Sequence, residues 1–204
     1  KQSNDCRVNM EKWQAIGGEI ERELPSDCAL IVDCLYGTGF KGSLLNADMG
    51  MVERINALKT SGMKVLAADI PSGVNGENGR VERLAVQADV TLCIGELKTG
   101  VFLGDGIDYA GEIKRADIRI QLLPEGRYAR LMDGALAHSL LPVRKRNSHK
   151  GTYGRAAIVA GSVEYTGAAW LASSACLRSG VGYTALFLPS ELLPLYALKT
   201  PEIL

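Results

Sequence analysis

Residues 30–43 decide the fold, and they read Leu30-Ile31-Val32-Asp33-Cys34-Leu35-Tyr36-Gly37-Thr38-Gly39-Phe40-Lys41-Gly42-Ser43. A continuous apolar run that ends in a glycine-rich loop is typical of a buried parallel strand leading into a helix. Asp33 is unusual in such a strand, because an unpaired buried charge is costly. We therefore expect a cation, a hydrogen-bond network or a ligand to compensate the charge of Asp33.

Further apolar runs extend this pattern on both sides. Strands are predicted over 29–36, 64–69 and 90–94, with a helix centred on 51–58 between the first two and one more strand over 116–120. Helical spacing of apolar residues also predicts a helix over 10–24. Strand, helix and strand in this order predict a βαβ unit, and the continuous apolar runs predict a parallel sheet covered on both faces. The strand 29–36 is too apolar to be exposed on either face.

The second predicted strand ends in Asp69-Ile70-Pro71-Ser72-Gly73. Ligands of open α/β sheets bind outside the carboxyl ends of the strands. Two strands that each bring an acid and a small polar loop to one edge of a sheet therefore predict a ligand site. Two plainer interpretations stay open: Asp33 caps a turn, and residues 69–73 are an ordinary turn, since their residue types favour turns.

The second half of the sequence predicts another α/β segment. Residues 124–126 predict a turn, and 131–141 a short helical connector; a basic cluster then occupies 144–151. A strand over 155–160, a helix over 167–178 and a strand over 183–188 predict a second βαβ unit. We place a first domain at 1–125, a linker at 126–143 and the beginning of a second domain at 144–204.

Composition favours a binder of small molecules. The 23 basic and 23 acidic residues balance, so charge gives no support for a nucleic acid or an anionic membrane as partner. Five scattered cysteines without a CxxC motif indicate a reducing compartment, and no apolar stretch is long enough to span a membrane. We expect a cytoplasmic protein. The sequence begins without Met and has the appearance of the middle of a longer chain.

The glycine spacing has one literal interpretation. Gly37, Gly39 and Gly42 spell GxGxxG, the fingerprint of dinucleotide-binding dehydrogenases. The ribose-binding acid should follow about 20 residues later, whereas Asp69 lies 27 residues beyond Gly42, and Asp33 has no role in that scheme. A P-loop does not fit, because Lys41 precedes the last glycine. A NAD-dependent oxidoreductase stays an alternative.

Three motifs in order carry a closer resemblance over residues 1–122: Asp33 with Gly37-Thr38-Gly39-Phe40, then Asp69-Ile70-Pro71-Ser72-Gly73, then Lys98-Thr99-Gly100. This part resembles the NAD(P)H-hydrate epimerases, the YjeF N-terminal domain family. The resemblance implies a Rossmann-like layered fold and epimerisation of the hydrated cofactors NADHX and NADPHX. It implies a catalytic Asp69 in contact with the substrate, potassium bound by Asp33 and Ser72, and a substrate-binding loop formed by Gly37, Thr38, Gly39, Phe40, Lys41, Gly42 and Ser43. Lys98 is alternatively a solvated lysine of a loop.

Residues 144–204 resemble the opening of the ADP-dependent NAD(P)H-hydrate dehydratases, which have a ribokinase-like α/β fold. The motifs are His149-Lys150-Gly151-Thr152-Tyr153-Gly154-Arg155, then Ala160-Gly161-Ser162 and Gly167-Ala168-Ala169. The resemblance implies dehydration of the S epimer with ADP and magnesium, and places Ala168 against the substrate. Alternatively, residues 167–169 are small only for helix–sheet packing.

The two resemblances in this order match the bifunctional repair enzymes. The implied partners are NADHX or NADPHX, ADP and further copies of the chain in a homo-oligomer, with neither nucleic acid nor a membrane. The upstream Asn-, Gly- and Asp-rich loop of the epimerases and the nucleotide-binding loop and catalytic Asp of the dehydratases are not in the sequence. We therefore expect an internal fragment that is inactive as a dehydratase and weak or inactive as an epimerase. A non-catalytic nucleotide-binding or partner-binding scaffold is a further alternative.

Overall fold

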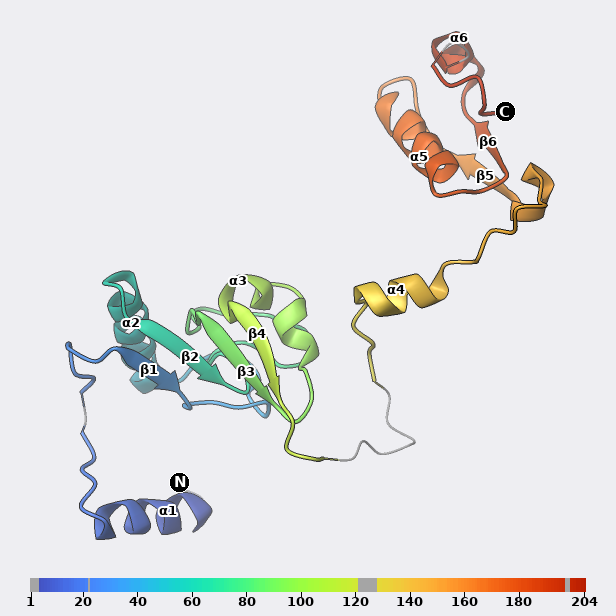
Figure 1. Cartoon of the computed structure of the whole chain (residues 1–204). Coiled ribbons are helices and arrows are strands. Elements are labelled where there is room, and N and C mark those ends of the chain that lie inside the picture. Colours follow the sequence, from blue (N-terminus) through green and yellow to red (C-terminus); the bar gives the residue numbers. More distant parts are fainter. Residues whose placement is uncertain (1–3, 22, 121–127, 197–198) are drawn as a thin grey trace. The chain divides into compact units, whose positions relative to one another are not determined.

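The computed structural model describes residues 4–21, 23–120, 128–196 and 199–204. It divides the chain into two compact units, Lys1–Arg130 and Leu131–Leu204 (Figure 1). Among the described residues, no helix has the length and apolar character needed to cross a membrane.

The first unit is built on a four-stranded parallel sheet. Its strands are β1 (Leu30–Asp33), β2 (Lys64–Ala68), β3 (Val90–Ile94) and β4 (Glu112–Ala116), and they lie in the order β1-β2-β3-β4. Asp33 lies opposite Ala67 in the register of β1 and β2. Because the strands are parallel, the loops that follow β1, β2 and β3 leave the sheet at one edge. This Rossmann-like sheet confirms the predicted α/β class.

Helix α2 (Asn46–Thr60) packs on the sheet of the first unit, and two short helices connect β3 to β4. Helix α2 connects β1 to β2 and buries Val52, Ile55 and Leu58 in one core with Ile31 and Val65 (Figure 1). This apolar stripe has the i, i+3 spacing of a helix face directed at a core. The short helices η1 (Thr99–Phe102) and α3 (Gly106–Ala110) lie between β3 and β4, and α1 (Asn4–Ala15) begins the described chain.

Three predictions about elements were wrong. The helix predicted over 10–24 ends at Ala15, because Gly17 takes a φ of +86° that breaks the helical path. The strand predicted over 116–120 lies at 112–116, because Gly111 ends α3 with a φ of +60° and the chain pairs with β3 from Glu112 onward.

The third wrong prediction concerns the burial of β1. Leu30 and Val32 are 52% and 51% exposed, whereas Ile31 and Asp33 are buried. The strand lies at the edge of the sheet, and α2 packs against one of its faces. Only alternate residues of the strand therefore enter the core. A continuous apolar sequence therefore did not mean burial on both faces here.

Asp89 connects the start of β3 to its neighbours. Its carboxylate accepts a hydrogen bond of 2.8 Å from the N–H of Val65 and lies 3.2 Å from Lys59 Nζ and 3.4 Å from Lys64 Nζ. Desolvation opposes the charge, but the Val65 N–H and the two lysines outweigh it and hold the pKa of Asp89 below its ordinary value of 3.8. A lowered pKa stabilises the fold above the unfolded-state pKa, and the contribution is lost as the pH falls through the folded-state pKa.

We expect Asp89→Ala to lower the free energy of unfolding by about 1–3 kcal/mol at neutral pH, because the Val65 N–H and both lysines lose their acceptor. The difference from the unchanged protein should shrink as the pH falls below 3.8. Urea unfolding followed by circular dichroism at several pH values measures it. A difference that stays constant into the acid range would contradict this account.

The second unit is a strand–helix–strand arrangement. Strands β5 (Arg155–Val159) and β6 (Tyr183–Phe187) pair in parallel, and α5 (Gly167–Arg178) connects them (Figure 1). These bounds agree with the predicted elements to within one residue, and the predicted connector contains α4 (Gly134–Leu140). The remaining helices are η2 (Lys150–Tyr153), η3 (Ser190–Leu192) and α6 (Leu193–Tyr196).

Candidate functional site

The loops after β1, β2 and β3 meet at the carboxyl edge of the first sheet. The N–H of Gly100 donates a 2.8 Å hydrogen bond to the carbonyl of Gly76, which fixes the third loop on the second. A Cβ atom added at Gly100 would lie 2.1 Å from the carbonyl oxygen of Asn75, so this close approach requires glycine. Between the first and second loops, Lys41 Nζ and Glu77 Oε1 form a 3.1 Å ion pair.

Asp33 links the first two loops through hydrogen bonds. Its side chain is buried, its Oδ2 accepts a 2.8 Å hydrogen bond from the N–H of Ser72, and its Oδ1 accepts one of 2.6 Å from Ser72 Oγ. The N–H of Leu35 donates to Oδ1 at 3.2 Å, and the N–H of Tyr36 donates to Ser72 Oγ at 2.9 Å. A hydrogen-bond network therefore compensates the buried charge, and Asp33 does more than cap its own turn.

The same groups offer oxygen ligands for a cation. Asp33 and Ser72 are both buried, and the carbonyl oxygen of Tyr36 lies 3.5 Å from Ser72 Oγ. A carboxylate has about four lone-pair positions, and the hydrogen bonds described above use three of those of Asp33. Carboxylate, hydroxyl and carbonyl oxygens are the donors that hard cations prefer. The donor set at Asp33 thus fits an alkali cation.

The glycine loop is held by apolar anchors and exposes its polar groups. Phe40 and Leu44 are buried in the core, and the ring of Phe40 contacts that of Tyr36 edge-on at 5.0 Å. The other members of the predicted substrate loop are exposed: Gly37, Thr38, Gly39, Lys41, Gly42 and Ser43. Because the ring of Phe40 is buried, the backbone of this residue is the part that faces a ligand.

Space above the loop is open. A Cβ atom added at Gly37, Gly39 or Gly42 would meet no atom within 4 Å, and Gly42 takes a φ of +85° that favours glycine. The loop leads through Leu45 into the first turn of α2. Loop and helix are tied together by Tyr36, whose hydroxyl donates to Asp48; this hydrogen bond raises the pKa of Tyr36. Backbone N–H groups that precede a helix in this way suit an anionic group such as a phosphate.

Asp69 has an unusual backbone at the end of β2. Its φ is +74°, a left-handed conformation that few residues other than glycine adopt. Its N–H donates to the carbonyl of Leu92 at 2.9 Å, and its Oδ1 accepts from the N–H of Ile94 at 2.9 Å. Residues held in such conformations cluster at functional sites. A turn follows at residues 71–74, closed by the 3.0 Å hydrogen bond from the N–H of Val74 to the carbonyl of Pro71, while the contacts of Asp69 anchor the start of this segment on β3.

Lys98 lies beside Asp69. Its ammonium group forms an ion pair with Asp69 Oδ1 and donates a 2.6 Å hydrogen bond to the carbonyl of Ile94. The side chains of Lys98 and Asp69 are only 17% and 20% exposed. The interpretation of Lys98 as a solvated loop residue is therefore wrong. The sequence places this lysine in the Lys98-Thr99-Gly100 motif, but its contact with Asp69 is seen only in the structure, because the two residues lie in different loops.

The second unit places Ala168 on the exposed side of α5. Its neighbour Ala169 is buried, and a Cβ atom added at Gly161 would lie 3.0 Å from the Cβ of Ala169. Packing thus explains the small residues Gly161 and Ala169. Since Ala168 itself is exposed, packing does not explain why it is small.

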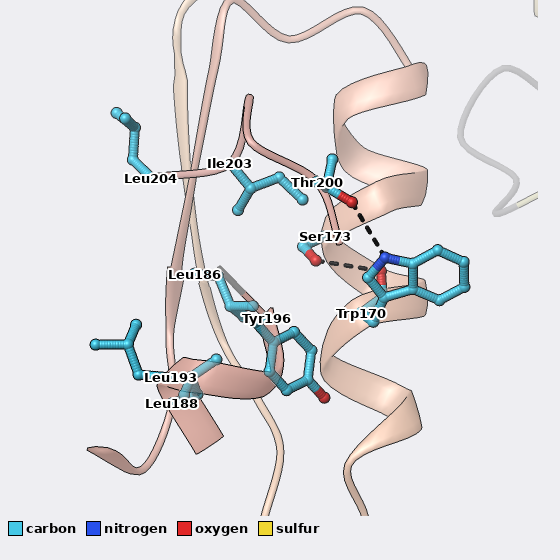
Figure 2. Close-up of a pocket in the computed structure, with 9 residues that line it drawn as sticks. All are labelled: Trp170, Ser173, Leu186, Leu188, Leu193, Tyr196, Thr200, Ile203 and Leu204. Atoms are coloured by element: carbon cyan, nitrogen blue, oxygen red, sulfur yellow. Dashed lines mark hydrogen bonds between the residues drawn. The ribbon is translucent and has the colours of Figure 1, made fainter. Parts of the chain in front are cut away.

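A small pocket lies on another side of α5 (Figure 2). It measures about 70 Å³ and is mostly apolar; its lining residues are Trp170, Ser173, Leu186, Leu188, Leu193, Tyr196, Thr200, Ile203 and Leu204. Trp170 Nε1 donates to Thr200 Oγ1 at 3.1 Å, and Ser173 Oγ donates to the carbonyl of Trp170 at 3.2 Å (Figure 2). Ser173 Oγ also lies 2.7 Å from the carbonyl oxygen of Ala169, to which it donates. The indole and hydroxyl groups are therefore already paired, and Ala168 does not line this pocket.

Comparison with known proteins shows what the first unit is similar to. The family model described as YjeF-related protein N-terminus matches residues 1–100. Residues 1–100 are thus similar to this family. Asp33, Asp69, Ser72 and Lys98 all lie within this matched segment.

Curated relatives extend the similarity beyond the YjeF-related segment. The chain is 34% identical to the bifunctional NAD(P)H-hydrate repair enzyme Nnr of Moorella thermoacetica, over 98% of the chain and 40% of the relative. It is 32% identical to the protein of the same name in Vibrio cholerae, over 98% and 41%, and 30% identical to the bifunctional NAD(P)H-hydrate repair enzyme of Leishmania braziliensis, over 94% and 36%. The chain thus spans about 40% of the length of the first two relatives, and the match includes both of its units.

Proposed function

We propose that the first unit is an epimerase that interconverts the R and S forms of NADHX and NADPHX. The observation that carries the proposal is the meeting of three loops around Asp69, Asp33 and Ser72 in a YjeF-related unit. The names of the relatives point to hydrated nicotinamide cofactors as the substrate class. In the natural polypeptide that contains this chain, we expect the two activities of a bifunctional repair enzyme.

Different loops bind different parts of the substrate. The open glycine loop, Gly37 to Ser43, takes the phosphate end of the dinucleotide through its backbone N–H groups. The hydrated nicotinamide ring lies toward Asp69, which is partly exposed at the adjoining strand end. A potassium ion held by Asp33 and Ser72 would supply positive charge beneath the first two loops. This cation would add to the hydrogen-bond network that joins those loops.

The chemistry requires a base at the hydrated carbon. The hydroxyl of NADHX sits on a ring carbon that also carries the ring nitrogen. When a base takes the hydroxyl proton, the carbon–oxygen bond becomes a carbonyl and the carbon–nitrogen bond opens, with its electrons passing to nitrogen. Closure on the opposite face and return of the proton give the other epimer. Asp69 is the group that we assign to this proton transfer, because a general base must lie within hydrogen-bond reach of its proton.

The second unit supplies the beginning of a dehydratase. There we propose that Ala168 contacts the substrate, because it is exposed on the first turn of α5 and packing does not account for its size. Loss of water from the S epimer would use ADP and magnesium, bound by parts of the natural polypeptide other than the site described above. Epimerisation followed by S-specific dehydration would allow both epimers to be repaired.

The test is a spectroscopic assay on the natural polypeptide that contains this chain. A mixture of R- and S-NADHX is supplied with ADP, magnesium and potassium, and the returning near-ultraviolet absorbance of NADH is followed. We expect complete conversion of both epimers. No return of absorbance with either epimer would contradict the proposal, and tight binding of undamaged NAD that depends on Gly37 but not on Asp33 would favour an oxidoreductase instead.

A further inference from the structure

Lys98 is the cation that touches Asp69. It follows β3 by four residues, and its ammonium group contacts both Asp69 Oδ1 and the carbonyl of Ile94. The Ile94 N–H donates to the same Oδ1 atom. One carboxylate oxygen therefore has two donors that come from β3 and from the loop after it. Among the described residues, no hydrogen bond to Asp69 Oδ2 is formed.

The fold fixes the position of Lys98. The N–H of Gly95 donates to the carbonyl of Ala116 at 2.9 Å, so β4 holds the start of the loop. The N–H of Gly100 donates a hydrogen bond to the carbonyl of Gly76, and Val101 is buried in the core. The end of the loop is therefore held as well. Lys98 lies between these two anchors with only a sixth of its side chain exposed. A surface lysine that pairs by chance would not be held in this way.

We infer that Lys98 is a positioning residue for the proposed epimerisation, and that it holds Asp69 Oδ1 so that Oδ2 faces the reacting hydroxyl. This inference rests on the proposed function. Asp69 needs such a holder because its left-handed backbone directs the side chain toward β3 rather than along its own strand. A carboxylate with both oxygens unrestrained would rotate, and small misplacements of a reacting group can cost about 100-fold in rate.

The test is steady-state kinetics of Lys98→Met, Asp69→Asn and the double variant in the natural polypeptide. Lys98→Met should lower kcat by about 10- to 100-fold with KM changed less than about 3-fold. In the Asp69→Asn background it should cause no further loss, since Lys98 acts through Asp69. Arg7→Met is the matched control: Arg7 forms a 2.7 Å ion pair with Glu11 within α1 of the same unit. The kcat of this control should equal that of the unchanged protein.

Three outcomes would overturn the inference: an unchanged kcat in Lys98→Met, a higher KM with unchanged kcat, or losses that multiply in the double variant. If Lys98→Met fails to fold, Lys98→Ala with added ethylamine replaces it, and recovery of kcat by the amine is then expected. Full activity in Asp69→Asn, or no epimerisation by the unchanged protein, would instead overturn the proposed function itself.

Discussion

Asp69→Asn is expected to lower the rate of epimerisation by about 100- to 10,000-fold, the usual contribution of a general acid or base. The amide oxygen of Asn still accepts from the Ile94 N–H, and Asn tolerates the left-handed backbone that Asp69 adopts. The variant should therefore fold like the unchanged protein. In the absorbance assay with ADP, magnesium and potassium, only the S fraction of NADHX should be converted.

Asp117→Asn is a suitable control for this prediction. Asp117 is an exposed acid of the same unit that directly follows β4, and its carboxylate accepts from the N–H of Arg119. It should leave the conversion of both epimers intact. Complete conversion of the R epimer by Asp69→Asn would show that Asp69 is not the base. Loss of conversion in both variants would point to a general effect on the fold.

Asp33→Ala is expected to have the largest effect on stability. Removal of the carboxylate leaves the N–H and hydroxyl groups of the buried Ser72 without their acceptor, and the N–H of Leu35 as well. We expect the free energy of unfolding to fall by about 2–5 kcal/mol. Asp33→Asn should lose less, because its amide oxygen can still accept one of these hydrogen bonds.

Urea unfolding in potassium chloride and in choline chloride at equal ionic strength measures both effects. If Asp33 and Ser72 hold potassium, the unchanged protein gains stability in potassium, because a ligand that binds only the folded state stabilises it. Asp33→Asn should gain much less. An unfolding midpoint of Asp33→Ala equal to that of the unchanged protein would contradict the structural role. An equal potassium effect in Asp33→Asn would contradict the cation site.

The sequence predicted the elements that local patterns control. Apolar runs predicted β1, β2 and β3, an apolar stripe predicted α2, and a segment rich in small residues predicted α5 with its exact bounds. The 10–24 helix and the 116–120 strand were misplaced for another reason. In both regions, a single glycine with positive φ, Gly17 or Gly111, sets where the element ends or begins. Apolar spacing continues past such a glycine without showing it.

The candidate site was predictable where its chemistry is visible in one segment. A charge inside an apolar strand indicated that Asp33 needs compensation, and Ser72 provides it. The pair of Asp69 and Lys98 was not predictable, because Asp69 follows β2 whereas Lys98 lies in the loop after β3. The path of that loop is fixed by the contact of Gly100 with Gly76, two residues 24 positions apart in the sequence. Spacing alone does not reveal such a contact.

The most direct test of the account uses pure R-NADHX without ADP, so that no dehydration competes. The natural polypeptide that contains this chain is added in potassium-containing buffer, and the two epimers are separated by liquid chromatography over time. We predict that the R form relaxes to a mixture of R and S much faster than in buffer, and that Asp69→Asn abolishes this acceleration. Persistence of the R form at the uncatalysed rate with the unchanged protein would contradict the proposed epimerase.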